Sequence, residues 1–202
     1  MTTAAFEWGV AQLTLPGEHE CGDKYVVEPF EGGALVAVVD ALGHGREAAR
    51  VADAAVATLV PNAKENLDVL MQRCHSSIRE TRGATMSLAS FDWRQRTMTW
   101  LGVGNVVGVL MRNFQKTSPR IESLLVRAGV VGYQLPDPHP LVMPIEPGDT
   151  LILATDGVRD LFTEILPAVI EPQRLANRIL TTYAKHRDDA TVLVFRCNGS
   201  EG

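Results

Sequence analysis

A run of six apolar residues that ends in an aspartate constrains this chain most strongly. Residues 34–39 are all alanine, leucine or valine, and Asp40 follows them directly. A short continuous apolar run of this kind is typical of a strand that is buried on both faces. A carboxylate at the end of such a strand costs free energy unless something compensates its charge. A metal ion is the natural compensator.

The residues after Asp40 leave a second interpretation open. The chain continues as Asp40-Ala41-Leu42-Gly43-His44-Gly45, and an alanine-rich helical pattern begins at Glu47. Glycines allow a sharp backbone turn and the close approach of a ligand. They are equally common in ordinary turns, and Asp40 could simply cap the following helix. This stretch alone does not separate a metal ligand from a helix cap.

Composition excludes several classes of function. The chain has 202 residues, 46% of them hydrophobic and 21% charged, which suits a single domain over residues 1–202. The formal net charge is -5, and no basic run indicates binding to nucleic acid or to a membrane. We expect no signal segment and no membrane-spanning run. The three widely separated cysteines, Cys21, Cys74 and Cys197, predict reduced thiols in a cytoplasmic protein.

Apolar periodicity predicts an α+β fold. Helical spacing covers Glu47–Val60, Leu67–Arg79 and Pro172–His186, with a short helix at Val158–Ile165. Strands are predicted at 6–14, 24–30, 34–39, 85–91, 97–103, 106–111, 121–126, 150–154 and 191–196, and residues 129–147 predict an irregular segment with one short strand. This order is not the regular alternation of a doubly wound sheet. It indicates antiparallel sheets with helices packed outside them.

Acidic residues recur beside the predicted buried strands. Asp40 and Asp156 each follow such a strand, and the pair Asp188-Asp189 precedes one, as does Asp23. Antiparallel neighbours bring the end of one strand beside the start of another, so these carboxylates could converge at one rim. Mg²⁺ or Mn²⁺ would hold them together, and two such ions can activate a water for attack on a phosphate. The spacing alone does not select this chemistry, because acidic loop residues are usually solvated.

Five short motifs, taken together, resemble one known family. They are Gly22-Asp23, Asp40-Ala41-Leu42-Gly43-His44-Gly45, Gly83-Ala84-Thr85-Met86-Ser87, Thr155-Asp156-Gly157 and Asp188-Asp189-Ala190-Thr191. In this order they resemble the metal-dependent serine/threonine protein phosphatases (the PPM, or protein phosphatase 2C, family). The resemblance is greatest to the bacterial SpoIIE branch and, within it, to the short feedback phosphatases of the stressosome. The motifs extend over nearly the whole chain.

The resemblance implies both a fold and an activity. The fold is an αββα sandwich of two antiparallel sheets flanked by helices, with two Mn²⁺ or Mg²⁺ ions at one end. Asp40 would bridge the ions, the carbonyl of Ala41 would bind one of them, and Asp156 and Asp188 would bind the other. Asp189 would have a supporting role. The implied reaction is attack of metal-activated water on phosphoserine or phosphothreonine in stressosome-type signalling proteins.

The chain departs from the family pattern near the expected metals. Asp23 matches an acidic position that can hold a water there, but Gly22 stands where many members have glutamate. Leu42 replaces a histidine that can act as general acid. His44 could take over this role, or a water could protonate the leaving oxygen, or His44 could be a turn residue only. Asn105 stands where relatives have aspartate, which is a better metal ligand, and no phosphate-binding arginine is evident.

Two other functions remain open at this stage. The same fold could serve as a non-catalytic adaptor, although the retention of Asp40, Asp156 and Asp188 argues against it. The chain could also hydrolyse small phosphate compounds, because no arginine clamp is visible. A covalent phosphocysteine mechanism is not expected, because the sequence has no cysteine-x5-arginine loop.

Overall fold

The apolar run before Asp40 lies in strand β3 (Gly33–Ala41) of the computed structural model, which describes residues 5–112, 120–165 and 170–199. Residues 34–39 are fully buried. Alternate side chains of β3 enter two different cores, and this is why no polar residue interrupts the run. Leu35, Ala37 and Val39 face a core beneath helices, whereas Ala34, Val36 and Val38 face a core between two sheets.

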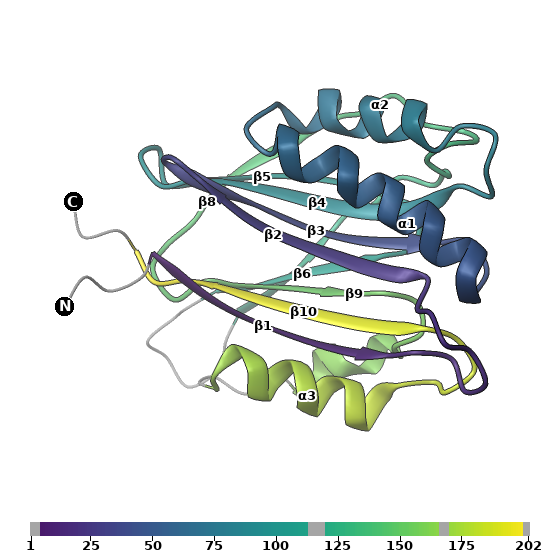
Figure 1. The fold of residues 1–202 in the computed structure, drawn as a ribbon. Helices are drawn as coiled ribbons and strands as arrows, with labels where there is room; N and C mark the ends of the chain where they lie inside the picture. Colours follow the sequence, from purple (N-terminus) through teal and green to yellow (C-terminus); the bar gives the residue numbers. More distant parts are fainter. Residues whose placement is uncertain (1–4, 113–119, 166–169, 200–202) are drawn as a thin grey trace.

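Two five-stranded antiparallel sheets lie face to face (Figure 1). The first sheet has the order β2-β3-β4-β5-β8. In it β3 pairs with β2 (Asp23–Phe30) and β4 (Ala84–Asp92), and β5 (Thr97–Val103) and β8 (Leu141–Pro144) extend the sheet beyond β4. The second sheet has the order β1-β10-β9-β6-β7, formed by β1 (Phe6–Leu13), β10 (Ala190–Cys197), β9 (Thr150–Ala154), β6 (Val107–Arg112) and β7 (Arg120–Leu124).

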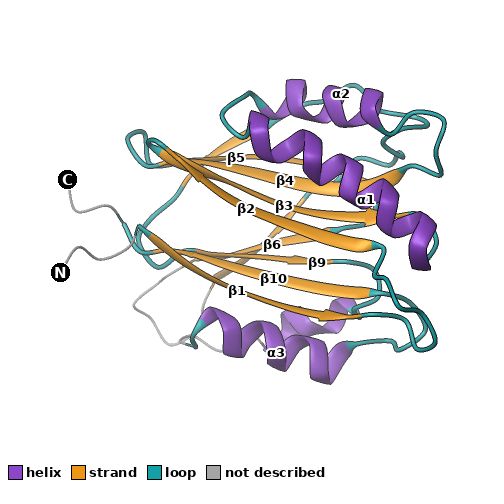
Figure 2. Cartoon of the chain, in the orientation of Figure 1, coloured by secondary structure: helices purple, strands orange, loops and turns teal. Residues whose placement is uncertain are grey.

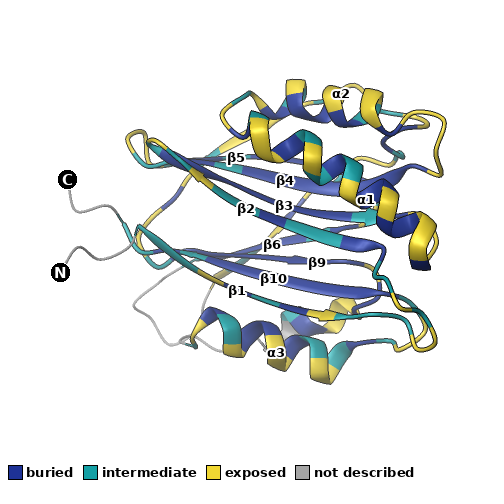
Figure 3. Cartoon of the chain, in the orientation of Figure 1, coloured by how far each residue is buried: buried dark blue, intermediate teal, exposed yellow. Residues whose placement is uncertain are grey.

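Helices cover the outer face of each sheet (Figure 2). Helices α1 (Gly45–Leu59) and α2 (Leu67–Ser77) lie on the first sheet, and α3 (Pro172–Tyr183) lies on the second. Short 3₁₀ turns occupy Val60–Asn62 (η1) and Asp160–Ile165 (η2). Buried residues face inward in every layer (Figure 3). The layers enclose three apolar cores, one between the sheets and one under each set of helices.

The predicted sandwich of antiparallel sheets and outer helices is confirmed. The irregular segment 129–147 contains one short strand, β8, as expected. The helix predicted at Val158–Ile165 is a 3₁₀ turn that begins only at Asp160, because Val158 forms a β-bridge with Ala184 instead. Helix α3 ends at Tyr183, before the predicted end at His186, whose φ of 56° lies outside the helical region. Among the described helices, none has the length and apolar character needed to cross a membrane.

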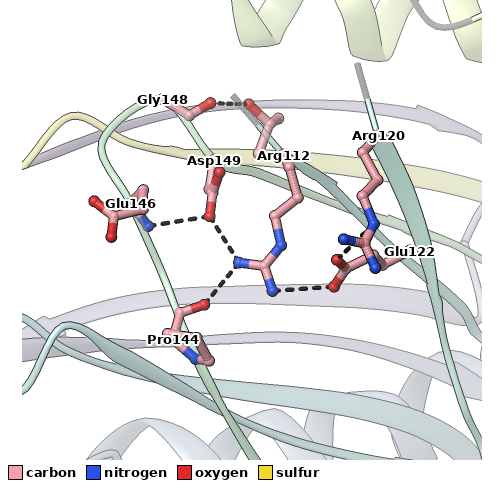
Figure 4. A network of polar contacts seen from close by, with 8 residues as sticks. Arg112, Arg120, Glu122, Pro144, Glu146, Gly148 and Asp149 are labelled. Carbon is pink, nitrogen blue, oxygen red and sulfur yellow. Dashed lines mark hydrogen bonds and ion pairs between the residues drawn. The ribbon is translucent and has the colours of Figure 1, made fainter. Parts of the chain in front are cut away.

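An ionic network stabilises the end of the sandwich at which β9 begins. Asp156 lies just beyond the other end of the same strand. Arg112, at the end of β6, donates hydrogen bonds to Asp149 Oδ2 at 2.9 Å and to Glu122 Oε2 at 3.0 Å (Figure 4). It also donates to the carbonyl oxygen of Pro144 at 2.7 Å. The side chain of Arg112 is only 14% exposed and that of Asp149 only 2%. Four strand ends are therefore joined around one poorly hydrated guanidinium.

We expect Arg112→Ala to lower the free energy of unfolding by about 3 kcal/mol, because it leaves Asp149 buried without its cationic partner. Arg120→Ala is the matched control. Arg120 pairs with the same Glu122 at 3.4 Å but is 69% exposed, so its loss should cost less than about 1 kcal/mol. Urea unfolding of both variants measures the difference. Equal losses in the two variants would contradict a buried role for Arg112.

Candidate active site

Strand pairing brings the acidic motifs together at one end of the sandwich, away from the two termini (right in Figure 1). In the first sheet, Asp23 at the start of β2 lies directly opposite Asp40 near the end of β3. In the second sheet, β9 and β10 are antiparallel neighbours, so Asp156 follows β9 beside the start of β10. The two sheets thus present their carboxylates to each other across their shared end.

One cavity of about 440 Å³ collects three of the predicted metal ligands, Asp40, Asp156 and Asp188. Its wall is completed by the residues Leu42, Gly43, Thr85, Gly104, Asn105, Ala128, Gly129 and Val130. Asp40 comes from the first sheet, and the other two carboxylates come from the second. The structure therefore confirms the expected convergence of these side chains, whereas their role as metal ligands stays a prediction.

Asp156 is held by two residues that the sequence did not identify as its partners. The Nδ2 of Asn105 donates a hydrogen bond to Asp156 Oδ2 at 2.8 Å, and Asn105 Oδ1 accepts one from Thr85 Oγ1 at 2.6 Å. Thr85 lies opposite Asp40 in the register of β3 and β4. The Nζ of Lys185 donates to the backbone oxygen of Asp156. The sequence identified Asn105 only as a poor metal ligand. In the structure its side chain orients the carboxylate of Asp156, which is a better ligand.

Asp23 and Asp189 are buried behind the cavity and joined to the backbone around it. Thr155 Oγ1 donates to Asp23 Oδ2 at 2.8 Å, which links the two sheets. Asp189 accepts hydrogen bonds from the N–H groups of Leu15 at 2.8 Å and Gly22 at 2.7 Å. Asp189 therefore fastens the segment that leads into Asp23, whereas its supporting role at a metal site stays a prediction.

The space around Gly22 explains one departure from the family pattern. A Cβ at this position would lie 2.8 Å from Ala48 Cβ and 3.1 Å from Asp189 Oδ2. Helix α1 therefore packs too closely for the glutamate that many relatives carry. The alanine-rich face of this helix makes the close approach possible.

The remaining predicted residues lie at the edge of the site. Ala41 is buried, and its N–H donates to the carbonyl oxygen of Gly22 at 3.2 Å. His44 is exposed at the start of α1, with Nδ1 2.7 Å from Glu18 Oε1. His44 is not among the residues that line the cavity in the described part of the chain. The roles of the Ala41 carbonyl and of His44 stay predictions.

Burial and mutual repulsion raise the pKa values of the acidic side chains. Burial, followed by repulsion from neighbouring aspartates, raises the pKa of Asp40 to about 8. Burial raises the pKa of Asp23 to about 7, although the Thr155 hydrogen bond opposes this. Burial and Asp188 also raise the pKa of Asp156, against the lowering effect of Lys185. Negative charge is thus under-compensated at this end of the sandwich.

The donor set fits a hard divalent cation. Carboxylate and carbonyl oxygens are the ligands that Mg²⁺ and Mn²⁺ prefer. Within the described ranges, no group of three or more His, Cys, Asp or Glu side chains is arranged so that it could hold a metal ion. The carboxylates alone therefore do not form the site, and water would complete the coordination of an ion held here, as is usual for Mg²⁺ in proteins.

The raised pKa values predict how the metal-free chain responds to pH. The native state binds more protons than the unfolded chain between the ordinary pKa of 3.8 and the native value of about 8 for Asp40. Stability in a chelator should therefore fall as the pH rises through this window. Asp40→Asn should melt above the wild type at pH 8, by about 2–4 °C for each kcal/mol of repulsion relieved, with the gap shrinking toward pH 4.

Thermal melting in chelator at pH 4, 6 and 8 measures this effect. Asp137→Asn, at an exposed aspartate outside the cavity, is the control and should follow the wild type at every pH. A difference between Asp40→Asn and the wild type that does not change with pH would contradict the argument.

Comparisons with known proteins agree with this geometry. The family model described as Stage II sporulation protein E (SpoIIE) matches residues 31–198. Phosphoserine phosphatase RsbX of Bacillus subtilis (strain 168) is 29% identical over 191 residues, 92% of each chain. A structure from work on the bacterial stressosome as a modular system has 30% identity and a TM-score of 0.84, over 95% of this chain and 99% of the other. The crystal structure of RsbX in complex with magnesium has 24% identity and a TM-score of 0.84, over 98% of both chains.

Proposed function

Because this chain belongs to the SpoIIE family, we propose that it is a metal-dependent phosphatase that removes phosphate from serine or threonine side chains of stress-signalling proteins. The observation that carries the proposal is the cavity in which Asp40, Asp156 and Asp188 meet from two sheets. The relation to a phosphoserine phosphatase over 92% of both chains supports the same reaction. The chain is thus a protein serine/threonine phosphatase of the PP2C type.

Four groups of the chain would hold two Mn²⁺ or Mg²⁺ ions. Asp40 would contact both, the Ala41 carbonyl one, and Asp156 and Asp188 the other. Such ions supply Lewis-acid chemistry, which makes water nucleophilic near neutral pH and offsets the charge of the phosphate. The raised pKa values of Asp40 and Asp156 support this assignment, because both carboxylates line one cavity and neither has an ion-pairing side chain in the described part of the chain.

The other polar residues position these groups. Asn105 and Lys185 hold Asp156 from its side chain and its backbone, so that its free carboxylate oxygen can face the cavity. Thr155 holds Asp23 beside Asp40, where the Asp23 carboxylate can orient the attacking water. Preorganised groups of this kind need no rearrangement during the reaction.

His44 is the candidate acid for the leaving serine oxygen. A carboxylate such as Glu18 only accepts hydrogen bonds, so Nδ1 of His44 carries the hydrogen between them. The proton to be donated would then be on Nε2, in the imidazolium form. A water in the cavity is the alternative donor.

The biological setting is part of the same proposal. We assign the substrates to phosphorylated proteins of a stressosome-type system, because the relatives include RsbX and a structure from a stressosome study. We place the chain in the cytoplasm as one phosphatase domain over residues 1–202. Its cysteines Cys21, Cys74 and Cys197 are all free, which is compatible with a reducing compartment.

Hydrolysis of p-nitrophenyl phosphate should require Mn²⁺ or Mg²⁺ and should be lost in Asp40→Asn. Even residues that support metal ligands typically contribute 10- to 100-fold, so loss of the bridging carboxylate should lower kcat/KM by more than about 100-fold. Asp188→Ala should behave alike, and the exposed Asp137→Asn should not. Full activity in Asp40→Asn would remove the metal assignment, and no turnover with any divalent ion would favour an adaptor.

Substrate class is tested separately with a phosphoserine protein and free phosphoserine. A protein phosphatase should act on the phosphoprotein with the higher kcat/KM. Equal or better turnover of free phosphoserine would favour hydrolysis of small phosphate compounds instead.

A further inference from the structure

Arg82 lies in the turn between α2 and β4, beside the loop that follows Asp40. The N–H of Leu42 donates to the carbonyl oxygen of Gly83 at 3.0 Å, and this bond joins the two segments. A Cβ built on Gly43 would lie 2.5 Å from Nη1 of Arg82 and 3.7 Å from its Cζ. The guanidinium therefore packs directly on Gly43, which lines the acidic cavity. Any larger residue at position 43 would displace it.

The guanidinium is anchored on one side only. Its Nη2 donates to Glu47 Oε2 in the first turn of α1. Among the described residues, neither Nη1 nor Nε of Arg82 has a hydrogen-bond partner. Arginine has five N–H donors in a rigid fork, so the donors of Nε and of Nη1, which lies against Gly43, stay available. The side chain is 49% exposed and can be reached from solvent.

We propose that Arg82 binds the phosphate of the substrate at the rim of the acidic cavity, an inference that rests on the proposed phosphatase function. The cavity is lined by three aspartates in a chain of net charge -5, so a phosphate dianion needs a cationic side chain at its edge in addition to any metal ions that the aspartates would hold. A guanidinium fork matches two phosphate oxygens in geometry and charge. Glu47 holds the fork through Nη2.

Other cations near the cavity are less suited to this role. Lys185 already donates to the backbone oxygen of Asp156, which directs its ammonium to the protein. Arg127 has its Nη1 within 3.5 Å of the carbonyl oxygen of Asp137, and its guanidinium thus faces a different loop. Arg82 combines contact with a cavity-lining residue and unused donors.

The test compares Arg82→Ala and Arg82→Lys with wild type in Mn²⁺. The control is Arg73→Ala, which removes an arginine of similar exposure on α2 that pairs with Glu65, outside the acidic cavity. The measurements are KM and kcat for p-nitrophenyl phosphate and for a phosphoserine peptide, and inhibition by inorganic phosphate. Melting curves should be near wild type for all three variants, because exposed ion pairs contribute little to stability.

Arg82→Ala should raise KM for both substrates, and the inhibition constant of inorganic phosphate, by about 10- to 100-fold, as expected for loss of a charge-assisted hydrogen bond. The effect on kcat should be smaller, because the contact also exists in the ground state. Arg82→Lys, which keeps the charge but loses the fork, should be intermediate. Arg73→Ala should match the wild type.

Unchanged phosphate inhibition in Arg82→Ala would overturn the inference, even if KM for the peptide rose, because Arg82 would then contact the peptide chain rather than its phosphate. An inactive wild type would defeat the proposed function instead. In that case, titration of inorganic phosphate into the Mn²⁺-containing protein still decides the role of Arg82: weaker binding by Arg82→Ala supports it, and equal binding contradicts it.

Discussion

The active end of this molecule depends on one electrostatic constraint: several carboxylates from two facing sheets lie close together, some of them buried, with too little positive charge around them. Antiparallel pairing places Asp23 against Asp40, and the second sheet presents Asp156 and Asp188 to them. The resulting rise in pKa means that the fold holds these groups at a cost in stability. Divalent ions would relieve the repulsion among these carboxylates, and the free energy recovered would favour ion binding. The same repulsion that lowers stability therefore supports the proposed metal-dependent function.

Hydrogen bonds from the backbone and from neutral side chains keep the carboxylates in place despite their repulsion. Thr155 joins Asp23 to the second sheet, Asp189 holds the segment before Asp23, and Asn105 holds Asp156. At the opposite end of the sandwich, the charge of the buried Asp149 is instead compensated directly by an ion pair with Arg112. The fold thus pairs Asp149 with an arginine where only rigidity is needed, whereas no described side chain forms an ion pair with Asp40, Asp156 or Asp188, where a ligand must bind.

Much of this could be predicted from the sequence, because the relevant signals are local. The apolar run before Asp40 predicted a doubly buried strand, and the position of each aspartate at a strand end predicted their convergence. The partners of Asp156 could not be predicted, since Asn105 is 51 residues away and Lys185 is 29 residues away, and no local pattern records either contact. The sequence predicts a helix at Val158–Ile165, but the structure has a 3₁₀ turn at Asp160–Ile165. The difference arises because Val158 forms a β-bridge with Ala184, a contact 26 residues away that periodicity does not indicate. Arg82 was overlooked because its contact depends on the turn at Gly43, where φ is 91°.

Direct titration of Mn²⁺ into the metal-free protein by calorimetry tests the central claim most closely, because it does not depend on the substrate. The account predicts saturable binding of two ions near pH 7.5, with release of protons from the carboxylates whose pKa values are raised, and loss of both ions in Asp40→Asn. Binding in Asp40→Asn with the stoichiometry and affinity of the wild type would contradict the account, as would an absence of binding to the wild type.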